Sequence, residues 1–145
     1  MRKLMLLGLF GFLQAGCSEE KITKDFLNGE WICNQKVFKK SDLEANYEEP
    51  IKTERQKRIF KFDGDDLYSY SSKTGEKEYL IKIDAINDDS PQVENTEDEK
   101  ITTISKFKKD NSEQWTWIHE VIHFSKTLDL SDSKEKYETV CTRIK

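Results

Sequence analysis

The sequence predicts an all-β fold, an antiparallel up-and-down meander of about eight strands that closes into a barrel. Short segments of alternating apolar and polar residues follow one another along the chain, as expected for half-buried strands. Turn residues such as Asp63-Gly64 and Gly75 separate these segments, and helical periodicity is almost absent. We expect closure because it removes the two unpaired edges of an open meander.

The N-terminus has the pattern of an export signal. Arg2 and Lys3 precede an uncharged apolar run from Leu4 to Leu13, which is the arrangement of a secretory signal peptide. A helix needs about twenty apolar residues to cross a bilayer, and this run has only about half that length. We therefore expect a transient export signal rather than a permanent membrane span.

A cleavage and lipidation motif follows the apolar run. Ala15 and Gly16 directly precede Cys17, and Gln14 stands where Leu is commonest. The segment resembles the lipobox of bacterial lipoproteins, which implies cleavage before Cys17 and acyl chains such as palmitate on that residue. Several acyl chains give a stable anchor. The alternative is an ordinary cleaved signal with an unrelated Cys17, although no Ala-x-Ala site lies nearby.

This resemblance implies three parts of the chain and a location. Residues 1–16 would be the signal peptide, 17–24 a lipidated tether, and 25–145 the β domain. Ser18 follows the cysteine in place of the Asp that retains lipoproteins at the inner membrane. In a cell with two membranes we therefore expect attachment at the periplasmic face of the outer membrane.

The charge of the mature chain excludes some partners. Removal of residues 1–16 takes away two of the 24 basic residues and none of the 28 acidic ones, which gives a net charge of −6. The 129 residues that remain suffice for one domain. Basic residues form no stripe interleaved with aromatic residues, so nucleic acid is not an expected partner.

The expected elements follow the alternation and the turns. Gly29–Phe38 reads as the first strand, and one short helix should follow over Ser41–Glu49, where Ser41 and Glu44 have capping-box spacing. Residues Ala85–Asp98, with Pro91, read as a loop. The other expected strands are Gln56–Phe62, Asp66–Ser72, Lys77–Asp84, Lys100–Phe107, Glu113–Phe124, a short strand at Thr127–Leu130, and Lys136–Ile144.

Two cysteines remain once Cys17 carries lipid. Cys33 lies in the first expected strand and Cys141 in the last, and an even pair in an oxidising compartment is expected to form a disulfide. For a loop of about 100 residues the chain-entropy model assigns a stabilisation of about 4.7 kcal/mol. The bond would tie the two ends of the meander together.

The position of that disulfide predicts a second contact. If Cys33 opposes Cys141 in an antiparallel pair, then Trp31 opposes Arg143. Trp31 lies two residues before Cys33, and Arg143 lies two residues after Cys141. A guanidinium over an indole face is a favourable cation–π pair, worth about 0.5–2 kcal/mol. We therefore expect Trp31 and Arg143 to form a structural pair.

These features resemble lipocalin-like domains, in particular small bacterial lipocalin-like lipoproteins. Such barrels begin with an apolar turn and Gly-x-Trp, matched here by Phe26-Leu27 and Gly29-Glu30-Trp31, and place an Arg of the last strand across that Trp. The hairpin over residues 60–64 is also similar. The resemblance implies a barrel with its closed end at Trp31. The alternative is a flatter sandwich in which Trp31 is simply a core aromatic.

One motif points to different chemistry. His119-Glu120-Val121-Ile122-His123 matches H-E-x-x-H, in which two histidines on a helix bind zinc and Glu120 acts as general base. The surrounding β-branched and aromatic residues favour a strand instead, where the histidines share a face but lie about 13 Å apart. A metzincin would have Gly at the position of Lys126 and His at the position of Asp129, so this chain departs from that pattern. Glu135 and Glu138 are the remaining candidates for a third ligand.

Three functions remain open, each with a structural condition. An open cavity above about 300 Å³ would favour a binding module for a small apolar ligand. A filled barrel with an exposed apolar patch would favour a partner protein of the envelope. A helix over residues 115–124 would favour a zinc-dependent hydrolase that uses His119, Glu120 and His123. Without that helix we expect neither a cofactor nor a catalytic residue.

Overall fold

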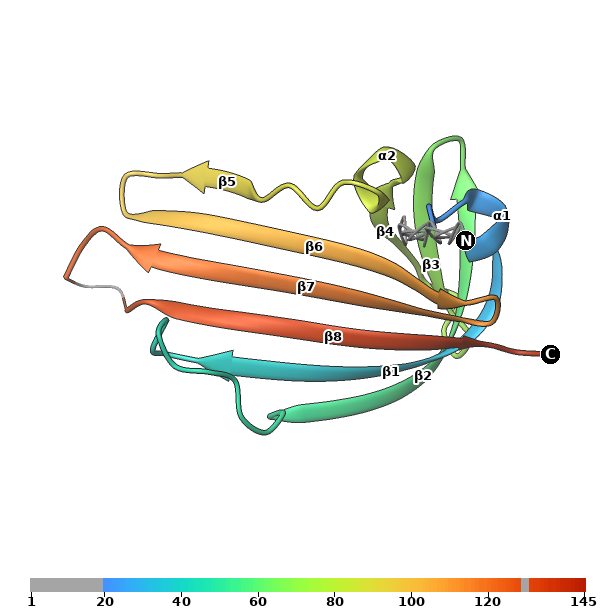
Figure 1. The fold of residues 1–145 in the computed structure, drawn as a ribbon, viewed down its shortest axis with the longest axis horizontal. Helices are drawn as coiled ribbons and strands as arrows, with labels where there is room; N and C mark the ends of the chain where they lie inside the picture. Colours follow the sequence, from blue (N-terminus) through green and yellow to red (C-terminus); the bar gives the residue numbers. More distant parts are fainter. Residues whose placement is uncertain (1–19, 129–130) are drawn as a thin grey trace, which may run out of the picture.

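Eight antiparallel strands form a single sheet in the computed structural model, which describes residues 20–128 and 131–145 (Figure 1). Their spatial order is β4-β3-β2-β1-β8-β7-β6-β5, so the first and last strands meet at the centre. This confirms the predicted all-β meander. The strands are β1 (Gly29–Lys40), β2 (Lys52–Asp63), β3 (Asp66–Ser71), β4 (Lys77–Lys82), β5 (Gln92–Asn95), β6 (Glu99–Asn111), β7 (Gln114–Ser125) and β8 (Ser133–Arg143).

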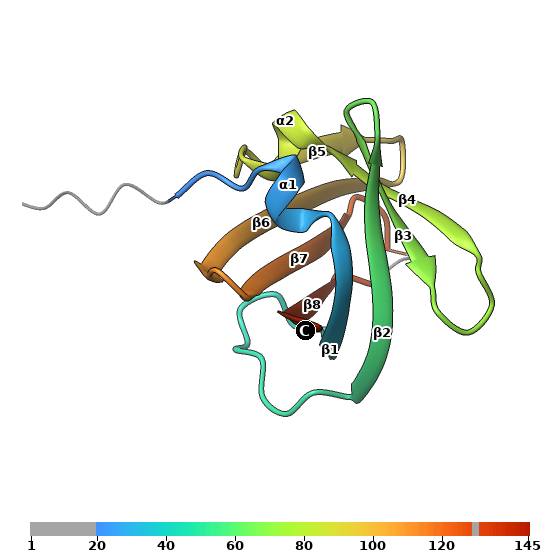
Figure 2. The same cartoon turned by 90° about the vertical axis from the view of Figure 1, so that its right-hand side faces the viewer.

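The sheet curls into a half-barrel rather than a fully hydrogen-bonded ring (Figure 2). Its two edges are β4 and β5, which do not pair within the described part of the chain. The chain between them does not form a hairpin, because it turns into the short helix α2 (Ile83–Ile86) and then passes Pro91. Ile86 is buried beside the core, so the connection fills space that direct pairing of the edges would need.

The expected helix over Ser41–Glu49 is wrong, because this segment has no regular structure. The carboxylate of Asp42 accepts the backbone N–H of Glu44 at 3.0 Å, and such local side-chain bonds compete with helix formation. Tyr47 then lies against the outer face of the sheet, where its hydroxyl donates to Glu120 at 2.8 Å. Tertiary contacts therefore decide the path of this loop.

Three further differences concern short elements. The helix α1 (Lys24–Leu27) precedes β1 and is capped by the hydroxyl of Thr23, which accepts the Phe26 N–H at 3.2 Å. The strand β5 lies within the expected loop Ala85–Asp98. The expected strand at Thr127–Leu130 is wrong for its first two residues, which lie in a bend and turn, while 129 and 130 are outside the described residues. No helix in the described ranges is long and apolar enough to cross a membrane.

The register at the sheet centre is the predicted one. Cys33 lies opposite Cys141 and forms the disulfide, and Trp31 lies opposite Arg143. The Arg143 guanidinium lies 4.2 Å from the Trp31 ring centroid and also donates to the backbone carbonyls of Phe26 and Asn28. Since Trp31 is completely buried, this pair closes one end of the half-barrel.

The apolar core lies at that closed end, where α1 and α2 cover the sheet (Figure 1). The indole N–H of Trp31 donates to the Leu27 carbonyl at 2.8 Å, which attaches α1 to the sheet. Trp115 packs edge-on against Trp31 with ring centroids 6.1 Å apart. Leu27, Leu67 and Trp115 have no exposed surface. This packing leaves the rest of the concave face free of apolar filling.

The start of the described chain is attached to the same end. The backbone N–H and carbonyl of Ile22 bond to the side-chain amide of Asn87 at 3.0 and 3.1 Å. Ile22 is also buried in the core. The predicted lipidation site, Cys17, lies outside the described residues.

Candidate functional site in the concave face

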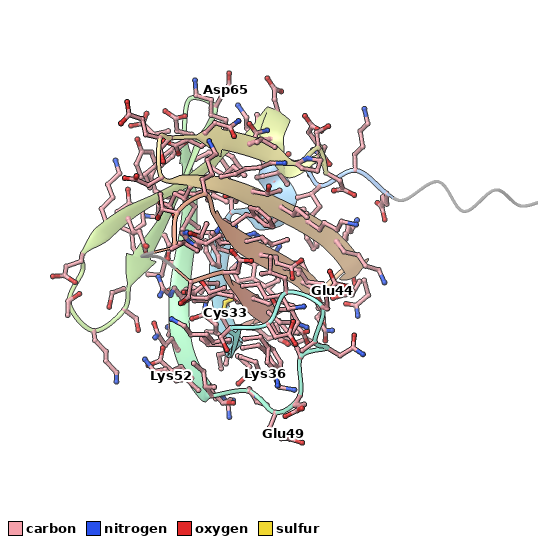
Figure 3. The ribbon with its side chains drawn as sticks, turned by 90° about the vertical axis from the view of Figure 1, so that its left-hand side faces the viewer. Cys33, Lys36, Glu44, Glu49, Lys52 and Asp65 are labelled. Atoms are coloured by element: carbon pink, nitrogen blue, oxygen red, sulfur yellow. A yellow bond between two sulfur atoms is a disulfide. The ribbon has the colours of Figure 1, made fainter. Side chains whose placement is uncertain are left out.

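An open cavity of about 500 Å³ occupies the concave side of the half-barrel. Its lining comes from β1, β2, β3, β4, β7 and β8. Strand alternation explains this, because every second residue of a curled sheet points inward. On β7 the inward residues are Trp115, Trp117, His119, Val121 and His123. Figure 3 shows Cys33 in the interior of the molecule, with the yellow bond of its disulfide.

Aromatic rings form the inner wall of the cavity. The ring of Phe60 packs edge-on against Trp115 at 5.3 Å between centroids, and Trp117 stacks on Phe107 at 5.1 Å. Phe60 and Trp115 are buried, whereas Trp117 is partly exposed. Such interlocked rings hold their positions without a ligand, so this wall is preformed.

Neutral polar groups lie next to the aromatic wall. The Gln35 amide donates to the Thr139 hydroxyl at 3.2 Å across the β1–β8 pair. His119 lies 2.7 Å from the Ser105 hydroxyl through Nδ1, and burial lowers the pKa of its imidazole below the ordinary value. His119 is therefore neutral at neutral pH and can act as donor or acceptor.

Charged groups surround the mouth of the cavity in pairs. Arg58 binds Glu78 at 3.1 Å and also donates to the buried Ser69 hydroxyl at 2.9 Å. On the other side, Glu135 accepts from Lys39 at 2.7 Å and from Tyr137 at 2.9 Å.

The same contacts shift two pKa values. The bond from Lys39, followed by that from Tyr137, lowers the pKa of Glu135, and the bond to Glu135 raises the pKa of Tyr137. Glu54, a third carboxylate of the lining, pairs with Lys52 at 2.7 Å. Each of these carboxylates has its own cation, so the mouth has no strong preference for an ionic ligand.

The H-E-x-x-H motif lies on strand β7, so the helix that a zinc protease requires is absent there. His119 and His123 both line the cavity, whereas Glu120 lies on the opposite face, where it accepts a hydrogen bond from Tyr47. His123 pairs with Glu99 at 3.1 Å. Within the described residues no group of three or more His, Cys, Asp or Glu side chains could hold a metal ion. The alternative predicted from the sequence, a strand with two histidines on one face, is the one observed.

Sequence reasoning did not identify several residues of the cavity. Gln35, Thr139 and the Arg58–Glu78 pair come from four different strands and carry no motif. Alternation does place Gln35 on the same face as Cys33. The inward direction of that face, however, depends on how the whole sheet curls.

Comparison with family models, curated proteins and solved structures finds no match to this chain.

Proposed function

We propose that this protein is a small-ligand binding module held at the cell envelope by lipid on Cys17. The observation that supports this function is the open cavity of about 500 Å³ on the concave face. Ligand sites in proteins span about 300–1,000 Å³ and combine apolar walls with a few polar groups. The cavity has both properties.

The lining indicates the kind of ligand. Phe60 and Trp117 offer flat apolar surface to a ring or short chain. Gln35, Thr139 and His119 offer neutral donors and acceptors next to it. Since the carboxylates at the mouth are paired with cations, we propose an uncharged ligand with an apolar ring and at least one polar group.

The proposed location is supported by the sequence and by the attachment of the tether. The lipobox-like segment and Ser18 imply a lipid anchor, at the periplasmic face of the outer membrane if the cell has two membranes. Ile22 is bonded to Asn87, and Cys17 precedes it by five residues. The anchor on Cys17 would therefore lie at most about 17 Å from Ile22. The disulfide agrees with an oxidising compartment.

Ligand binding can be tested with N-phenyl-1-naphthylamine, a neutral fluorophore with apolar rings and one N–H. We expect its fluorescence to rise on binding and the emission of Trp117 to be quenched. Gln35→Trp should place an indole inside the cavity and weaken binding at least about tenfold. Asn34→Trp is the matched control, because Asn34 is the neighbouring exposed residue on the outer face. Equal binding by both variants, or none by the unmodified protein, would refute the proposal.

The anchor is tested separately. Protein extracted from membranes should have the mass of a chain beginning at Cys17 with acyl chains attached, and Cys17→Ser should move it out of the membrane fraction. A chain cleaved elsewhere, or a free thiol at Cys17, would show that the anchor is wrong while leaving the ligand proposal intact.

A further inference from the structure

We propose that the outer face of β6 and β7 docks on an anionic lipid surface, beside the point where the Cys17 lipid enters the bilayer. This face is defined by the lysines Lys100, Lys106 and Lys108 and the apolar residues next to them. The inference rests on the lipid anchor of the proposed function, and it adds an orientation of the domain on the membrane.

The lysines share one face of the sheet. Lys106 lies opposite Ile118 and Lys108 opposite Thr116, while the alternate residues Phe107 and Trp117 point into the core and the cavity. Lys100, Lys106 and Lys108 are exposed. The outward residues of β6 between 100 and 108 include no acid, so this strand presents a row of positive charge.

Apolar side chains lie among these lysines. Phe124, opposite Lys100, is 52% exposed, and Val93 on the neighbouring strand β5 is 53% exposed. Ile104 and Ile122 are partly exposed on the same face. A surface with apolar side chains between lysines suits the boundary between lipid headgroups and acyl chains.

The acid on the outer face of β7 is already engaged. Glu120 lies between Ile118 and Ile122 and accepts the hydroxyl of Tyr47 at 2.8 Å. Tyr47 belongs to the acidic loop 41–51, in which Figure 3 labels Glu44 and Glu49. Glu120 is thus held by a neutral donor on the side of β8 and β1. On β6, Lys108 lies 3.9 Å from the carboxylate of Asp110, while Lys100 and Lys106 have no ion-pair partner among the described residues.

The described chain begins beside one end of β6. Lys109, at the end of β6, binds the carboxylate of Glu20 at 2.6 Å and lies 4.9 Å from the ring centroid of Phe26. Cys17 precedes Glu20 by three residues, a span of at most about 10 Å. Lipid on Cys17 would therefore enter the bilayer near the Lys108 end of the lysine row, and Lys100 lies at the other end of β6.

The uneven distribution of charge favours one orientation of the domain on the membrane. The mature chain has a net charge of −6, so an anionic membrane repels the molecule as a whole. Acidic residues gather in the segments that connect strands, such as Asp42 to Glu49 and Asp84 to Asp89. The outer face of β6 and β7 combines exposed lysines with the exposed apolar side chains Phe124 and Val93, and docking by this face leaves the cavity on the side away from the membrane.

Flotation with lipid vesicles tests the proposal without the anchor. The chain from residue 17 with Cys17→Ser should float with vesicles of 70% phosphatidylcholine and 30% phosphatidylglycerol at low salt, and stay behind with pure phosphatidylcholine. Replacing Lys100, Lys106 and Lys108 together with Gln should weaken binding on the order of 100-fold. The matched control replaces Lys36, Arg55 and Lys57 with Gln, since these three are also exposed on the outer face, over β1 and β2.

A second variant tests the apolar part. Phe124→Ser should weaken flotation by a factor that salt does not change, whereas the effect of the lysine variant should fade as salt rises. Equal loss in the two triple variants, or equal flotation with neutral vesicles, would overturn the proposal. Retention on dextran sulfate without binding to vesicles would assign the face to a soluble polyanion and would also overturn it. A missing lipid on Cys17 would refute the anchor alone.

Discussion

At the scale of single residues, the two ends of the chain meet around Gly29, Trp31 and Arg143. Gly29 has a φ of 133°, and a Cβ added there would lie 3.0 Å from Nη1 of Arg143. Glycine is thus needed both for its backbone conformation and for the close approach of the guanidinium. This explains physically why the Gly-x-Trp pattern and the arginine of the last strand occur together.

Arg143→Lys should lower the free energy of unfolding by about 1–2 kcal/mol. Lysine keeps the charge but cannot lie flat over the indole while donating to two carbonyls, and such bonds contribute about 1.5–3 kcal/mol. Chemical denaturation followed by tryptophan fluorescence measures the change. Arg55→Lys, at an exposed site, should change stability by less than about 0.5 kcal/mol. Equal effects would show that Arg143 acts only as a surface charge.

His119 should make stability fall on mild acidification. Burial lowers its pKa in the folded protein, so below the ordinary value of about 6.5 the unfolded chain binds a proton that the native state resists. Stability should be constant above about pH 7.5 and decrease as the pH falls through 6.5 towards 5.5. Denaturation midpoints across this range should fall less for His119→Gln than for His123→Gln. An identical pH dependence in both variants would contradict this origin.

At the scale of elements, the loop between β1 and β2 shows where a local sequence pattern does not predict the structure. Ser41 and Glu44 have helix-capping spacing, yet the segment is irregular because Tyr47 contacts Phe38 and Glu120 on the outer face of the sheet. The ring of Tyr47 also lies 4.8 Å from the Lys134 ammonium. A contact between distant strands outweighs a weak local preference for helix.

The disulfide between β1 and β8 should be a large part of the stability. Removing it with Cys33→Ser and Cys141→Ser together should cost about 2–5 kcal/mol, because the unfolded chain regains the entropy of a long loop. Both cysteines are buried, so the reductant should act slowly on the folded protein. Denaturation of the double variant and of the fully reduced protein should agree. A loss below about 1 kcal/mol would show that the β1–β8 pairing suffices alone.

At the scale of the whole molecule, stability should be graded from the centre of the sheet to its edges. β1 and β8 have a neighbouring strand on both sides, whereas β5 has four exposed residues and one neighbour. Amide hydrogen exchange should therefore be slowest in β1 and β8 and fastest in β5, where local opening needs little energy. Mass spectrometry of exchanged peptides measures this order. Protection of β5 equal to that of β1 would indicate that the edges of the half-barrel are closed in solution.

The fold class, most strands and the β1–β8 register could be predicted from the amino-acid sequence alone. These follow from alternation, turns and the two cysteines, which are local patterns plus one covalent constraint. The tertiary structure decided the half-barrel, the irregular loop, the cavity and the lysine row on β6. Those features depend on how far the sheet curls and on which strands become neighbours. Leu80 on β4 and Val121 on β7 line the same cavity although four strands lie between them in the sheet. Only the curvature brings them together, because the pairing of neighbouring strands does not specify the shape of the whole sheet.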